Sequence, residues 1–140
     1  MYLRILVPLE NTPYDEAILA HVRKLAKNCG SAIVLIHVAD GWVARNYDEL
    51  ALRESEEMKD DRAYLVKVQH TLEAAGFATR THLAMGEPAK ELVRVAEVEH
   101  VDLIAMSTHG HRLLQDIIRG STADRVRHNV SIPVLMIKAR

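Results

Sequence analysis

Two glycines ten residues apart mark the segment of this sequence best suited to hold an anion. Gly110 follows Ser107-Thr108-His109, and Gly120 stands directly before Ser121 and Thr122, at the expected start of a helix. Glycine lets a ligand approach the backbone closely, and a helix N-terminus offers unpaired N–H groups and a partial positive charge. The hydroxyls of Ser121 and Thr122 add hydrogen-bond donors. This combination favours a phosphate-bearing ligand.

The charge around this segment also favours an anionic ligand. Between residues 107 and 128 four arginines stand against two aspartates, although the whole chain has a formal net charge of −1 at pH 7. A nearly neutral chain has no general attraction for nucleic acid, and an aromatic content of 4% leaves little surface on which bases could stack. We therefore expect a small anionic ligand and no nucleic-acid partner.

Other interpretations of these residues involve less chemistry. Both glycines could simply serve turns, with Ser121 and Asp124 forming a capping box. The chain has 8 histidines, but His109 and His111 have no carboxylate or cysteine at a spacing that supports a metal site, and Cys29 is the single cysteine. Neither a P-loop nor a dinucleotide-binding glycine motif is present, so a P-loop ATPase and a Rossmann dehydrogenase are not expected. We interpret His37, at the end of a buried run, as a hydrogen-bonded core or rim residue.

Short β-branched runs that alternate with helix-spaced segments must position these residues. Several runs are apolar throughout, which is typical of parallel strands covered on both faces. The order predicts a three-layer, doubly wound α/β fold, and 140 residues are enough for a single domain spanning 1–140. The expected strands are 3–9, 32–39, 78–84, 102–106 and 133–137, and the expected helices begin near 13, 47, 88 and 121.

The start of the first helix is expected to be capped. Thr12 can cap the helix, Pro13 suits its first position, and Asp15 can reach back to complete a capping box. Tyr14, Ile18, Val22 and Leu25 share one helical face and should be buried. The helix should stop at Gly30, the second at Gly76, and the third should bury Ala89, Leu92, Val93 and Ala96.

The two-glycine segment resembles a known family motif. Ser107-Thr108-His109-Gly110, then nine residues, then Gly120-Ser121 is similar to the Gly-x-x-Gly-x9-Gly-Ser/Thr motif of universal stress proteins. The resemblance extends over the whole chain. Ile5–Pro8 is similar to the opening strand of that family, Gly86–Ala89 to the start of its third helix, and Pro133–Ile137 to its closing strand.

The resemblance implies a five-stranded parallel sheet of order 3-2-1-4-5, as in adenine nucleotide alpha hydrolase-like folds. It also implies a regulatory homodimer of the cytoplasmic stress response, paired through Pro133–Ile137, that binds ATP with or without Mg²⁺, or AMP or ADP. Carried over by position, the binding residues are Pro8, Leu9, Glu10 and Val38 at the adenosine end, Met106, Ser107, His109 and Gly110 beside ribose and phosphates, and Gly120, Ser121 and Thr122 at the phosphates.

Two departures from the family pattern leave alternatives open. Ser107 replaces a glycine, and its Cβ restricts positive φ. Glu10-Asn11-Thr12 replaces the usual Asp-Gly-Ser, although Asn11 tolerates a left-handed backbone. One alternative is a member that binds no nucleotide and acts through an unknown protein partner. Another is a slow ATPase, with His109 or Glu10 as the general base. No apolar run approaches the roughly 20 residues of a membrane span and no signal peptide is apparent, so we expect a cytoplasmic protein with no membrane partner.

Overall fold

The computed structural model describes residues 1–39, 47–107 and 121–138, the side chains of 47–57 and 121–124 excepted. A five-stranded sheet of order β3-β2-β1-β4-β5 forms the middle layer, and each described neighbour pair is parallel. This confirms the predicted order. The strands are β1 (Arg4–Pro8), β2 (Ala32–Ala39), β3 (Thr79–Met85), β4 (Leu103–Ser107) and β5 (Val134–Ile137).

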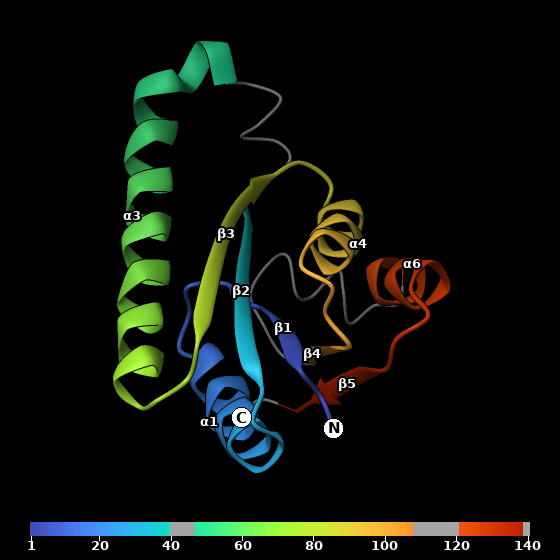
Figure 1. Ribbon diagram of the computed structural model, residues 1–140. Helices are drawn as coiled ribbons and strands as arrows, with labels where there is room; N and C mark the ends of the chain where they lie inside the picture. Colours follow the sequence, from blue (N-terminus) through green and yellow to red (C-terminus); the bar gives the residue numbers. More distant parts are fainter. Residues whose placement is uncertain (40–46, 108–120, 139–140) are drawn as a thin grey trace.

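Helices cover both faces of the sheet, as the apolar runs predict. On one face lie α1 (Asp15–Cys29) and α3 (Tyr47–Ala74), and on the other lie α4 (Pro88–Val98) and α6 (Ser121–Asn129), as Figure 1 shows. The two core clusters lie one on each face of the sheet. Because side chains alternate along a strand, Ile5 and Val7 of β1 join the α1/α3 cluster while Leu6 joins the α4/α6 cluster.

The predicted cap of the first helix is wrong. The helix begins at Asp15 with Tyr14 as its N-cap residue and has no side-chain cap, while the buried Thr12 hydroxyl makes no hydrogen bond within the described part of the chain. A turn precedes the helix, because the N–H of Asp15 donates to the Thr12 carbonyl at 3.0 Å. Asp15 does reach back, but its carboxylate binds the loop before Thr12 as well.

The predicted buried faces are correct in part. In α1, Ile18 and Val22 are buried, whereas Tyr14 is exposed and Ala26 is the next buried residue. In α4, Ala89, Leu92 and Ala96 are buried as expected, but Val95 is buried while Val93 is only partly so. The buried face of α1 is displaced by one position, from Leu25 to Ala26, whereas in α4 Val95 takes the place of Val93, two positions along the helix.

Gly30 ends α1 in a left-handed conformation, with φ +69°. Its N–H bonds back to the Ala26 carbonyl, which closes the last turn. A side chain at this φ is strained, so Gly30→Ala should lower the free energy of unfolding by about 1 kcal/mol in urea titrations. Gly30→Asn should cost less, because asparagine tolerates this region. Equal stability of wild type and Gly30→Ala would contradict the strain argument.

Candidate functional site

The candidate site lies at the carboxyl edge of the sheet, where the winding changes direction. β1 is flanked by β2 on one side and β4 on the other, so its two neighbours are reached in opposite directions along the sheet. Open α/β sheets bind ligands at such a switch point. The structure brings together here six residues that the sequence placed in the site: Pro8, Leu9, Glu10, Val38, Met106 and Ser107.

Most of these side chains are buried and belong to the core. Leu9 packs in the α1/α3 cluster, whereas Val38 and Met106 pack in the α4/α6 cluster. The Leu9 N–H donates to the Ile36 carbonyl of β2 at 2.8 Å, which extends the ladder beyond β1. A ligand at this edge would therefore meet backbone and the partly exposed Glu10 rather than an open apolar surface.

The Asp15 carboxylate fixes the loop that follows β1. It is buried, and it accepts hydrogen bonds from the backbone N–H groups of Asn11 at 2.9 Å and Glu10 at 3.1 Å, with Thr12 at the limit of 3.4 Å. The hydroxyl of Tyr64 in α3 also donates to it, at 2.6 Å. Because charge-assisted bonds are the strong ones, one carboxylate at the start of α1 positions the loop that carries Glu10.

A second group of contacts joins the same loop to β2 and α3. His37 Nδ1 lies 2.8 Å from the carbonyl oxygen of Leu9, and His37 Nε2 lies 3.1 Å from Asp61 Oδ2. The other oxygen of Asp61 accepts from the Asn11 side-chain amide at 3.3 Å. This confirms the prediction that His37 is a hydrogen-bonded residue of the core or rim. It also makes α3 the element that holds the loop from the side.

The surroundings of this loop shift two ionisation equilibria. Burial by itself lowers the pKa of His37. The hydrogen bond to Asp61, the Leu9 carbonyl and the negative charges of Asp61 and Asp15 together raise it above its ordinary value of 6.5. Burial, followed by the bond to Asp15, raises the pKa of Tyr64 well above its ordinary value of 10.0. The Tyr64 hydroxyl therefore keeps its proton and remains a donor at neutral pH.

The two departures from the family pattern have different backbone consequences. Asn11 adopts the left-handed conformation that asparagine was expected to tolerate, with φ +63°. Ser107 is the last residue of β4 and is buried, and it is not among the described residues with positive φ. The restriction that a Cβ places on positive φ therefore costs nothing at Ser107.

The far side of the candidate site is described only in part. Ser121 and Thr122 begin α6 as predicted, but nothing is described of their side chains, and His109, Gly110 and Gly120 lie outside the described residues. Arg125 of α6 bonds to Glu87 at 3.1 Å, and Glu87 caps α4 through the N–H groups of Ala89 and Lys90. This contact ties the start of α4 to the middle of α6.

Sequence reasoning missed the residues that hold the loop. The sequence pattern assigns Asp15 only to a helix cap and does not single out Asp61 or Tyr64. Their spacing of three residues places Asp61 and Tyr64 on one face of α3, next to the buried Leu65, and this polar pair beside an apolar stripe was the available signal. Nothing in the local sequence pairs them with residues about 50 positions earlier.

The described residues form neither a metal site nor a membrane-spanning helix. No group of three or more His, Cys, Asp or Glu in that part of the chain is arranged to hold a metal ion. Among the described helices, none is both long and apolar enough to cross a membrane.

Comparison with known proteins identifies the family. The sequence matches the family model described as "Universal stress protein family" over residues 1–138. The chain belongs to the universal stress protein family. One curated member, universal stress protein MJ0531 of Methanocaldococcus jannaschii, is 33% identical over 144 residues, which cover 99% of this chain and 83% of the relative.

Solved structures of universal stress proteins share the fold. The structure of MJ0577 from the same organism superposes with a TM-score of 0.81 at 28% identity, covering 100% of this chain and 98% of that one. The Archaeoglobus fulgidus universal stress protein in complex with dAMP has a TM-score of 0.70 at 21% identity, with 98% of each chain covered. At that identity the second comparison shows the fold alone.

Proposed function

We propose that this universal stress protein binds an adenine nucleotide at the carboxyl edge of its sheet and acts as a cytoplasmic regulatory homodimer. The observation that carries the proposal is the loop after β1, which Asp15, Tyr64, His37 and Asp61 hold beside the ends of β2 and β4. A loop fixed before the ligand arrives loses little entropy on binding. Membership of a family in which a structural neighbour has been solved with dAMP supports adenine as the base.

The nucleotide would lie across the switch point. Pro8, Leu9, Glu10 and the backbone of Val38 would receive the adenosine, and Met106 and Ser107 would border the ribose. We propose that His109 and Gly110 continue this border towards the phosphates. Gly120, Ser121 and Thr122 would hold the phosphates, since α6 begins at Ser121 and a helix N-terminus favours anions. ATP, with or without Mg²⁺, is the proposed ligand, and ADP and AMP are its smaller alternatives.

The proposed homodimer would pair through β5. This strand is the last in the sheet order, and Met136 on it is 38% exposed. An edge strand presents unpaired backbone groups that can bond to another chain. Sedimentation velocity of the whole chain tests this directly, with Met136→Pro as the variant. In the parallel register with β4 the N–H of Met136 faces the open edge, and proline cannot donate to a strand ladder. A monomer at all concentrations would contradict the proposed dimer.

Isothermal titration calorimetry of the whole chain against ATP with Mg²⁺, ADP and AMP tests nucleotide binding. We expect saturable heat at one site per chain for at least one of the three. Mass analysis of small molecules released from the purified, denatured protein gives an independent measurement of bound nucleotide. If none of the three nucleotides gives heat and none is released from the protein, the alternative is favoured: a family member that binds no nucleotide and acts only through protein contacts.

The variant Ser107→Gly distinguishes a protein that binds nucleotide from one that acts only through protein contacts. Since Ser107 already has an ordinary strand backbone, glycine supplies no conformation that the site lacks. We expect the nucleotide dissociation constant to change less than about threefold and the free energy of unfolding to fall by about 1 kcal/mol, the usual cost of glycine in a strand. A large gain of nucleotide affinity would show instead that Ser107 blocks binding in the natural chain.

A further inference from the structure

A separate hollow lies at the opposite, amino-terminal edge of the sheet. It has a volume of about 660 Å³ and is lined by residues that precede β1, β2 and β3 and by the second half of α1. Small-molecule sites are typically of about 300 to 1,000 Å³. Because the candidate nucleotide site is at the carboxyl edge, this hollow is distinct from it.

Small residues create the room. Half of the lining consists of glycine and alanine, which leave space between α1 and the turn that joins α3 to β3. A Cβ added at either of the two glycines would meet nothing within 4 Å. The small lining residues are Ala26, Gly30, Ala32, Ala75, Gly76 and Ala78.

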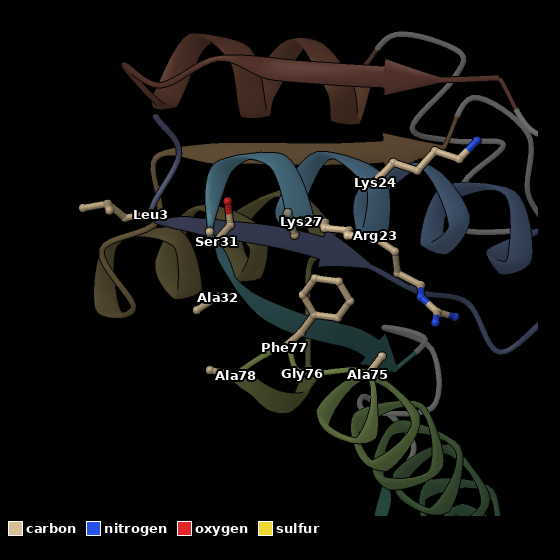
Figure 2. Close-up of a pocket in the computed structure, with 12 residues that line it drawn as sticks. Leu3, Arg23, Lys24, Lys27, Ser31, Ala32, Ala75, Gly76, Phe77 and Ala78 are labelled. Carbon is tan, nitrogen blue, oxygen red and sulfur yellow. The ribbon is translucent and has the colours of Figure 1, made fainter.

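The hollow has an apolar wall. Phe77, the only phenylalanine of the chain, packs partly against the α1/α3 core cluster, and the 71% exposed Leu3 stands at the other end. Figure 2 shows the Phe77 ring beside Arg23 and Lys27 of α1, above Gly76 and Ala75 of the turn. The apolar surface here is open to a ligand rather than filled by the protein's own side chains.

The rim of the hollow is positively charged. Arg23, Lys24 and Lys27 line it with no acidic residue, and none of the three makes an ion pair with the part of the chain that the structure describes. Arg23 and Lys27 are four residues apart on one helical face, where like charges repel. In Figure 2 the Lys24 side chain extends away from the ring, whereas the Arg23 side chain passes beside it. Lys27, one helical turn after Arg23, lines the same hollow.

The helix dipole explains only one of these charges. A cation in the last turn of α1 is favoured by the partial negative charge there, and Lys27 is in that turn. This effect falls off within a turn, and Arg23 and Lys24 lie before it. An anion bound between Arg23 and Lys27 would relieve their repulsion and complement the charge of the rim.

We propose that this hollow binds an amphipathic anion, a small molecule with one carboxylate-like head and a short apolar body. The head lies between Arg23 and Lys27, and the apolar body lies against Phe77, Leu3 and the alanines. The volume of the hollow, its apolar wall and its positively charged rim all fit this one chemical class. The proposal does not depend on nucleotide binding.

NMR titration of the ¹⁵N-labelled whole chain with decanoate, kept below its micelle concentration, tests the proposal. We expect saturable shifts of the amides of Ser31, Ala32, Gly76 and Ala78, unchanged when AMP is present. Decanol and decyltrimethylammonium have the same chain length without the negative charge, and both should bind at least about tenfold more weakly. Equal binding of the three compounds, or shifts that map elsewhere, would overturn the proposal.

Two variants and a control complete the test. The double change Arg23→Gln with Lys27→Gln should weaken decanoate binding about tenfold, because it removes both rim contacts. Ala78→Trp should abolish binding by filling the hollow, since the position is exposed and the core is not disturbed. The control variant Lys67→Gln changes an exposed residue of α3 outside the hollow and should bind decanoate as the natural chain does. Undiminished binding by either folded variant would contradict the assigned site.

Discussion

Replacement of Asp15 by alanine should lower the free energy of unfolding by about 3 to 5 kcal/mol. The substitution removes one buried acceptor and leaves several part-buried donors without it: the N–H groups of Glu10 and Asn11 and the hydroxyl of Tyr64. An unsatisfied buried donor costs about 1 to 3 kcal/mol, and bonds to a charged acceptor are at the upper end of the range. Urea unfolding, followed by circular dichroism, measures the loss.

A neighbouring residue provides the control for this prediction. Glu16 is also acidic and also in the first turn of α1, but it is exposed, so Glu16→Ala should change stability by less than about 1 kcal/mol. Tyr64→Phe removes only the phenol donor and should cost less than Asp15→Ala. A double-mutant cycle between Asp15 and Tyr64 should show coupling, because the two side chains are bonded at 2.6 Å. Additive effects of the two changes would contradict the assigned role.

The fixed loop also links this stability to the proposed binding. Since Asp15 holds Glu10 and Asn11 in the proposed binding conformation, Asp15→Asn should weaken nucleotide binding even under conditions in which the protein remains folded. The amide keeps one acceptor oxygen but turns an NH₂ group towards backbone N–H donors. The affinity of Glu16→Gln, which leaves the loop contacts intact, should match that of the natural chain.

The layers were predictable because they depend on patterns that are local in sequence. The continuous apolar runs of β1, β2 and β4 indicate burial on both faces, and the resemblance to the universal stress proteins supplied the order. Gly30 and Gly76 end α1 and α3 where the sequence placed those ends, since few other residues adopt positive φ easily.

The residues that hold the loop after β1 were not predictable in the same way. Asp15 next to Thr12 and Pro13 has the pattern of a capping box, and sequence alone cannot distinguish a carboxylate that caps its own helix from one that binds the preceding loop. Tyr64 and Asp61 meet Asp15, Asn11 and His37 only once α3 has packed on the sheet. Their partners are set by tertiary packing rather than by spacing.

The contribution of His37 to stability should decrease as the pH rises. Its two ring nitrogens both face acceptors, the carbonyl of Leu9 and the carboxylate of Asp61. Only the doubly protonated imidazolium donates to both, because the neutral ring has one N–H. Deprotonation therefore breaks one of the two contacts that join β2 to the loop and to α3.

The sign follows from the direction of the pKa shift. Asp61 and the Leu9 carbonyl outweigh burial and raise the pKa of His37 in the folded protein above its ordinary value of 6.5. The extra stability is then fully present below the unfolded-state pKa of about 6.5 and is lost as the pH rises through the higher folded-state value. The stability that His37 contributes is therefore lost over a pH range that begins near neutrality and extends to alkaline pH.

Comparison with His37→Gln isolates this effect from every other titrating group. At pH 5.5 the variant should be less stable than the natural chain by about 2 to 3 kcal/mol, the worth of a charge-assisted bond, and the difference should shrink steadily towards pH 9. His21→Gln, at an exposed position of α1, removes an imidazole without removing these contacts and should keep the pH profile of the natural chain. A difference between wild type and His37→Gln that stayed constant or grew with pH would show that the imidazolium is not what joins Leu9 to Asp61.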